Sequence, residues 1–129
     1  MNKKSKIAFN LSLIIYPFDL RFSFNETDNE VFDFMNKNLK SKIDIKNIQY
    51  ESDFSDAFLF IDVSGAGLIR MRYIPSTPKC YNLLQHEITH YVYFILSERI
   101  SMKHNRKTTE AYSYLTGYIT EKVYEKIFK

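Results

Sequence analysis

The stretch from Leu83 to Leu96, LLQHEITHYVYFIL, is the feature that most restricts the fold of this chain. Its apolar residues recur at three- and four-residue spacing, which predicts an α-helix, and they occupy nearly every side of that helix. Such a helix has to be covered by other elements, so we expect it at the centre of the domain. The expected helix begins at Pro78, after the N-cap Thr77, and ends at about Arg99.

Three polar residues in this stretch, His86, Glu87 and His90, form the motif HExxH. Residues four apart lie one turn apart on the same helix face, so both imidazoles can reach one Zn²⁺. Glu87 projects beside that face, where it can act as the general base that takes a proton from a zinc-activated water. The motif therefore indicates a zinc metallopeptidase that hydrolyses peptide bonds. The alternative is a buried helix with coincidental histidines, although burying these side chains without partners would be costly.

A catalytic zinc usually has three protein ligands, so the motif needs a third. Position 96 is Leu and position 93 is Tyr, which excludes the metzincin pattern of a glycine and a third histidine. Glu110 is the first candidate, because it lies near the start of the next expected helix, an antiparallel neighbour. Gly117, two turns later, would let the two helices approach closely, although an acid in a first helical turn is also ordinary. His104, in the connection, is the second candidate.

HEITH followed by TEAYSYLTGYI resembles the gluzincin pattern, in which HExxH on one helix is joined by a Glu on the next. Glu110, Ala111 and Tyr114 are similar to the Glu-Ala-x-x-aromatic signature of ImmA/IrrE-type metallopeptidases. The whole chain, including IIYPFDLRFSFNETD, also resembles small HExxH proteins encoded by tailed bacteriophages. The resemblance implies zinc as the cofactor, the two motif histidines and Glu110 as its ligands, Glu87 as the catalytic base, and the host cytoplasm as the location.

The groups around the metal depart from one known pattern. Thermolysin-like enzymes have an Asp four residues after the ligand Glu, and here that position is Tyr114, so the ligands must be oriented differently. Tyr114, Tyr118 and His104 are candidates for the donor that stabilises the oxyanion or supports the ligands. With ten tyrosines in the chain, packing is the alternative role for both tyrosines.

The remaining patterns predict an α+β fold in a single domain, residues 1–129. Alternating apolar residues predict strands, at 7–15, 20–24, 56–63 and 67–74, with a shorter one near 43–50. Helical spacing predicts helices from an N-cap at Thr27 or Asp28 to about Leu39, and at about 108–127. We expect a minimal zincin-like domain, with a small mixed or antiparallel sheet packed on the HExxH helix and on an antiparallel C-terminal helix.

The strand at 67–74 alternates apolar residues with Arg70 and Arg72, which predicts one buried and one wet face. A substrate peptide could add to this strand at the edge of the sheet.

Charge, apolar runs and cysteine content limit which partners and locations are expected. A net charge of +3, with basic residues spread along the chain, is too small for a nucleic-acid surface. No apolar run approaches transmembrane length, and Asn10 and Ser12 interrupt the only stretch that resembles a signal peptide. The single Cys80 fits a reducing compartment. We therefore expect a cytoplasmic protein with a peptide or protein substrate, no nucleic acid and no membrane, while the oligomeric state stays open.

Two functions from other classes remain as alternatives. One is a zincin-fold structural or interaction protein, part of a phage particle, that binds zinc without catalysis. The other is a zinc-free helical regulator, in which the motif residues only form hydrogen bonds.

Overall fold

A four-stranded mixed sheet is the frame on which the rest of the chain packs. The computed structural model describes residues 6–39 and 56–129. Strand β1 (Ile7–Ser12) pairs antiparallel with β2 (Asp19–Phe24), β2 runs parallel to β4 (Gly67–Met71), and β4 pairs antiparallel with β3 (Ala57–Ile61). The order is β1-β2-β4-β3. The predicted α+β class is confirmed, and the strand predicted near 43–50 lies outside the described residues.

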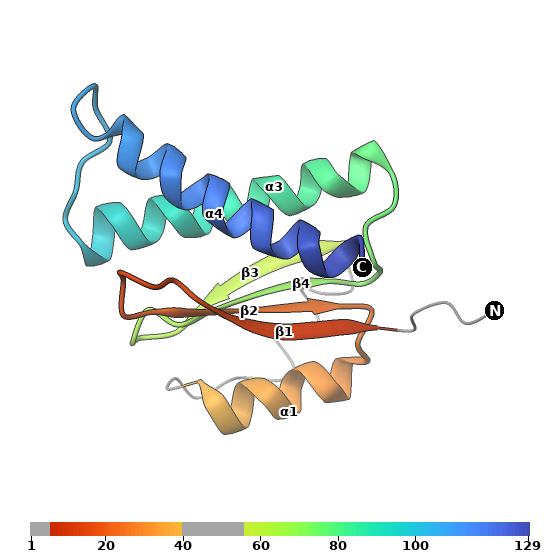
Figure 1. Cartoon of the computed structure of the whole chain (residues 1–129). Coiled ribbons are helices and arrows are strands. Elements are labelled where there is room, and N and C mark those ends of the chain that lie inside the picture. The colour runs from red at the N-terminus through yellow and green to blue at the C-terminus, as the bar shows by residue number, and fades with distance from the viewer. Residues whose placement is uncertain (1–5, 40–55) are drawn as a thin grey trace.

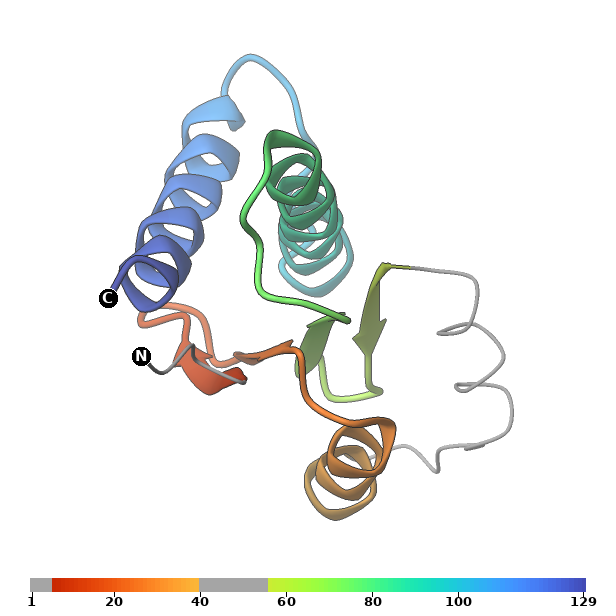
Figure 2. The same ribbon diagram turned by 90° about the vertical axis from the view of Figure 1, so that its right-hand side faces the viewer.

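Helices cover both faces of this sheet (Figure 1). Helices α3 (Pro78–Tyr93) and α4 (Thr109–Ile127) lie side by side on one face, and α1 (Asp28–Asn38) covers the other (Figure 2). Beyond Tyr93 the chain continues α3 with π-helical hydrogen bonding as η1 (Phe94–Arg99), so the helical segment ends where the sequence predicts. Among the described residues, no helix is both long and apolar enough to cross a membrane.

The main core lies between the sheet and the α3–α4 pair. The period of two along a strand sends alternate side chains of β2 and β4 to this face, where they meet one stripe from each helix. Its fully or almost fully buried members include Leu20, Phe22, Phe24, Ile69, Met71, Leu84, Ile88, Tyr91, Val92, Ile95, Leu96, Leu115, Ile119 and Val123. A smaller cluster of Val31, Phe32, Met35 and Leu68 joins α1 to the opposite face.

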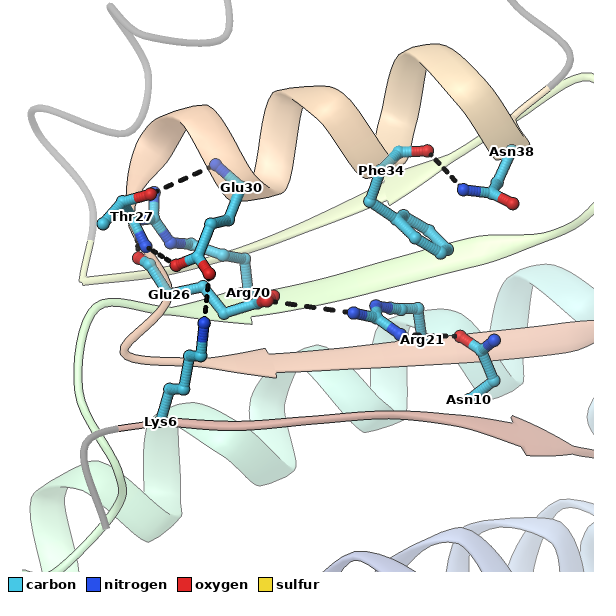
Figure 3. Close-up of polar contacts among 9 residues, drawn as sticks. All are labelled: Lys6, Asn10, Arg21, Glu26, Thr27, Glu30, Phe34, Asn38 and Arg70. Atoms are coloured by element: carbon cyan, nitrogen blue, oxygen red, sulfur yellow. Dashed lines mark hydrogen bonds and ion pairs between the residues drawn. The ribbon is translucent and has the colours of Figure 1, made fainter. Parts of the chain in front are cut away.

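Helix α1 overturns the prediction of a wet face on β4. Arg70 is only 3% exposed, because α1 packs over it. Its Nη1 lies 2.8 Å from Asp28 Oδ1 at the start of α1, and its Nη2 donates to the carbonyl oxygen of Glu26 at 2.9 Å. The same polar layer includes Arg21, whose guanidinium lies 3.8 Å from the Glu26 carboxylate (Figure 3). An arginine at an alternating strand position therefore marks a buried ion pair here, not contact with solvent.

The start of α1 is fixed by a capping box, which settles the choice of N-cap in favour of Thr27. Thr27 Oγ1 accepts a hydrogen bond from the Glu30 N–H at 3.1 Å, and Glu30 Oε1 accepts one from the Thr27 N–H at 2.9 Å. The Glu30 carboxylate also pairs with Lys6, just before β1, which ties the helix to the sheet (Figure 3).

The strand predicted as a peptide-binding edge is an inner strand. β4 is hydrogen-bonded to β2 on one side and to β3 on the other, so the prediction that a substrate could add to it is wrong. Among the described strands, β1 and β3 are the outer ones.

Candidate functional site

Helix α3, which carries HExxH, begins as the sequence predicts. Thr77 Oγ1 accepts a hydrogen bond from the Cys80 N–H at 3.3 Å, and Pro78 occupies the first helical position, where no N–H is needed. The motif therefore lies in regular α-helix, with His90 in the last turn of α3 before η1 begins.

Tyr91, the residue after the second motif histidine, fixes α3 against the sheet. Its side chain is fully buried, and its Oη donates to the carbonyl oxygen of Gly65 at 2.9 Å, in the turn between β3 and β4. Its ring lies so close to Gly67 that a Cβ there would be 2.5 Å from Tyr91 Cε1. Burial raises the pKa of the Tyr91 hydroxyl, so it stays a neutral donor. This contact sets the height and rotation of the motif above the sheet.

The two motif histidines lie together on the outer face of α3. The Nε2 atoms of His86 and His90 are 3.0 Å apart, and the two rings meet edge to face with centroids 4.4 Å apart. Two nitrogens bound to one tetrahedral Zn²⁺ at about 2.0 to 2.1 Å would be separated by about 3.3 Å. The pair therefore needs only a small side-chain adjustment to bind one metal ion.

The exposure of this face corrects the prediction that α3 is covered on nearly every side. His86 and His90 are both exposed, and so are Thr89 and Tyr93 on the same side of the helix. The sheet covers one side of α3 and α4 covers a second, and no other described helix or strand covers the third side (Figure 2). Because both histidines are exposed, the cost of burial does not require a metal here, and only their geometry indicates one.

Glu87 lies in a drier place than its neighbours in the motif. Its side chain is half-buried, and this burial raises the pKa of the carboxyl, while the imidazoles of His86 and His90 oppose the shift. A carboxylate with a raised pKa is a stronger base, and this is the direction that a general base at neutral pH requires.

The structure does not bring Glu110 to the histidines. Among residues 6–39 and 56–129, no group of three His, Cys, Asp or Glu side chains lies close enough to hold a metal ion. Glu110 is exposed in the first turn of α4, where its charge also suits the helix dipole.

The pairing of α3 with α4 explains this separation. Thr120 Oγ1 donates to Gln85 Oε1 at 3.1 Å, and the rings of Tyr93 and Tyr112 lie 4.8 Å apart, so the helices run antiparallel with these residues level. In this register Glu110 lies five residues past the level of the second motif histidine, which is about 7.5 Å, or nearly one and a half helical turns. The helix on which it lies was predicted correctly, but its register along α3 is not the one that the ligand assignment needs.

His104, midway along the connection between η1 and α4, lies in an aromatic cluster. Its ring contacts those of Tyr93 and Tyr112, with centroids 5.2 and 4.5 Å away. Its Nδ1 is 3.3 Å from Tyr93 Oη and its Nε2 is 3.4 Å from Thr109 Oγ1, so both ring nitrogens have hydroxyl partners. To bind a metal ion, His104 would have to give up one of these two hydroxyl partners.

Tyr114 and Tyr118 lie on the side of α4 that faces β1. Tyr118 Oη donates to the carbonyl oxygen of Ser12 at 3.4 Å, and Tyr114, which is 71% exposed, lies beside the loop between β1 and β2. The side of α4 that faces α3 carries Thr120 instead. The structure therefore does not bring either tyrosine to HExxH.

The sequence suggested that Gly117 lets α3 and α4 approach closely, and the structure does not show this. A Cβ at this position would meet no atom within 4 Å, because the residue faces open space. It lines a groove of about 570 Å³ between α3 and α4, together with residues that the sequence did not single out, notably Gln85 and Glu121. The sequence offers one sign of this lining, the helical spacing that places Glu110, Gly117 and Glu121 on one face of α4.

Comparison with known proteins adds no further information about the site. No protein-family model, no curated protein and no solved structure matches this chain significantly. A functional proposal therefore rests on the motif, on the resemblance that its residues carry, and on the geometry around it.

Proposed function

We propose that this chain is a zinc-dependent metallopeptidase in which His86 and His90 bind the metal and Glu87 is the general base. The observation that carries the proposal is the pair of Nε2 atoms 3.0 Å apart on an open helix face, with a half-buried carboxylate beside them. An exposed i,i+4 histidine pair alone indicates only a metal site, whereas the intervening glutamate adds the proton acceptor that peptide hydrolysis needs.

In the proposed reaction the metal, Glu87 and Tyr91 would each have a separate role. The bound metal would act as a Lewis acid towards water and the scissile carbonyl. Glu87 accepts a proton from water at its carboxylate and passes it to the leaving nitrogen, and its raised pKa favours the first transfer. Tyr91 keeps the motif in a fixed position, because its hydroxyl is bonded to the turn between β3 and β4.

Glu110 is the proposed third ligand, and it requires a movement. The start of α4 would have to shift along α3 by about one and a half turns for the Glu110 carboxylate to reach the level of His90. The π-helical end of α3, where the Ile100 N–H bonds to the Ile95 carbonyl, is an irregular segment next to the connection that would have to move.

A second candidate function is a zinc-binding structural or interaction protein of the same fold. The observation that favours it is the absence of a three-ligand group among the described residues. A metal held by the two histidines and by a partner would then bind without a catalytic environment.

Metal content is the first test. The protein, purified without added metal, is measured by mass spectrometry beside His86→Ala, Glu110→Gln and the control Glu125→Gln, an exposed acid on the same helix. One zinc per chain that is lost in the first two variants and kept in the control supports the proposed ligands. Zinc that survives Glu110→Gln removes that residue from the ligand set. A native chain that takes up no zinc overturns both functions.

Catalysis is tested with Glu87→Gln. A peptide library incubated with the zinc-loaded protein should be cleaved by the native chain and left intact by the variant, although both retain the metal. Equal cleavage by both would refute the role of Glu87, and zinc binding without cleavage would favour the structural alternative.

A further inference from the structure

A broad groove between α3 and α4, open to solvent, is large enough to hold a short ligand. Its volume of about 570 Å³ lies within the usual range for binding pockets, about 300 to 1,000 Å³. On α3 it is lined by Gln85 and Tyr93, two turns apart, in a row next to the one that carries the motif histidines. The groove therefore runs alongside HExxH without including it.

One end of the groove is aromatic. The rings of Tyr93, His104 and Tyr112 form a cluster with centroids 4.5 to 5.2 Å apart. Tyr93 is 41% exposed, so part of its ring remains open to a ligand. Such a surface favours another aromatic ring, through stacked or edge-to-face contact.

The other end of the groove is acidic. Glu121 lines it, and none of the ion pairs found among the described residues involves this carboxylate. The nearest acid along α4, Glu125, does pair with Lys122, at 3.7 Å. Beside Glu121, Gln85 accepts a hydrogen bond from Thr120 through its carbonyl oxygen, which leaves its amide N–H groups as donors for a ligand carbonyl. This end favours a cation attached to a peptide-like backbone.

The distance between the two ends sets the length of the ligand. From Tyr112 to Glu121 is nine residues of helix, or about 13 Å. An extended peptide covers about 13 Å in four residues, and residues four apart project to the same side of it. Gly117, which lies between Tyr112 and Glu121 on α4 and lines the groove, faces open space and leaves room for the peptide backbone.

We propose that the α3–α4 groove binds an extended peptide segment with an aromatic residue and, four positions away, a lysine or arginine. The aromatic ring contacts the cluster of Tyr93, His104 and Tyr112, and the cation pairs with Glu121. The inference does not depend on zinc or on catalysis. If the proposed peptidase function holds as well, the groove supplies sequence preference beside the motif.

The test is a binding measurement on the full chain in the presence of a chelator, so that cleavage cannot interfere. The probes are fluorescein-labelled Phe-Ala-Ser-Ala-Lys-amide and its reversed sequence Lys-Ala-Ser-Ala-Phe-amide, followed by fluorescence anisotropy. Two further peptides replace Lys by Gln or Phe by Ala in the tighter of these probes. We expect saturable binding of one probe, and weaker binding of both replaced peptides.

Variants assign the two ends separately. Glu121→Gln should weaken binding of the tighter probe by about threefold, the size of one exposed ion pair, and should leave the Gln-containing peptide unaffected. The control Glu125→Gln should change neither. Tyr93→Leu should weaken both Phe-containing peptides by about fivefold, the size of one aromatic contact, and should not affect the Ala-containing peptide.

Three results would overturn the inference. The first is that neither probe binds at 1 mM, about the weakest affinity worth assigning. The second is that the replaced peptides bind as tightly as the probe from which they derive. The third is that Glu121→Gln and Glu125→Gln lose the same affinity for the probe. Because the assay contains no metal, its failure leaves the zinc proposal standing, and failure to bind zinc leaves the groove standing.

Discussion

The contact between Gly67 and Tyr91 makes a prediction about how HExxH is held. Replacing Gly67 with Ala puts a Cβ 2.5 Å from Tyr91 Cε1 and 3.1 Å from Leu20 Cδ1. Ordinary contact begins at 3.4 Å, so the ring has to move by about 0.9 Å. The ring cannot yield easily, because it is fully buried and its hydroxyl is bonded to the Gly65 carbonyl.

The magnitude follows from two opposing effects. Overpacking a buried site costs about 1 to 3 kcal/mol, and the lower freedom of alanine in the unfolded chain returns about 0.4 to 1 kcal/mol. The net loss for Gly67→Ala is therefore about 1 to 2 kcal/mol, which lowers Tm by about 4 to 8 °C in a domain of this size. Because Tyr91 follows His90 directly, the displaced ring should also move the motif and weaken zinc binding.

Gly117→Ala is the matched control, since its Cβ meets no atom within 4 Å and lies inside helix α4. It should raise stability by about 0.5 to 1 kcal/mol, because alanine is the better helix former. Both variants are measured by thermal unfolding followed by circular dichroism, and then by zinc titration. The reasoning fails if Gly67→Ala melts at or above the temperature of the native chain, or if the two substitutions shift Tm in the same direction.

Three further predictions concern other parts of the chain. Ile14 has φ of 63° and is 69% exposed, so Ile14→Asn should stabilise the fold by about 1 kcal/mol in chemical denaturation; a loss would show that the side chain matters more than the strained backbone. Asp28→Asn removes the charge beside the buried Arg70 and should lower the free energy of unfolding by about 2 kcal/mol. The loss is smaller than for a fully buried pair because Asp28 is partly exposed, and the control Asp33→Asn on the same helix should cost little. Burial, more than any other cause, raises the pKa of Tyr73 to about 12, so the folded chain resists its ionisation and loses stability as the pH rises from about 10 towards 12; Tyr73→Phe should make that loss less steep in unfolding curves recorded at each pH, and an unchanged slope would contradict the assignment.

The elements that depend on near neighbours in the chain were predictable. The box of Thr27 and Glu30 fixes the start of α1, and Thr77 with Pro78 fixes that of α3. The spacing of His86 and His90 alone placed both imidazoles on one face, because a helix repeats every 3.6 residues whatever packs against it.

Features that depend on distant parts of the chain were decided only by the tertiary structure. Arg70 alternates with apolar residues as a solvent-facing side chain would, and only the packing of α1 shows that it is buried. His86 and His90 lie in an apolar run, and only the position of α3 beside α4 leaves them exposed.

In the candidate metal site, too, one part follows from local sequence and another from tertiary packing. The sequence by itself determined a helix that presents two histidines and a glutamate in metal-binding order, because those three residues lie within two turns. The distance from this motif to Glu110 depends on how far α4 slides along α3, and no local pattern encodes that register. It is set by long-range contacts such as Gln85 with Thr120 and Tyr93 with Tyr112, which only the folded chain brings together.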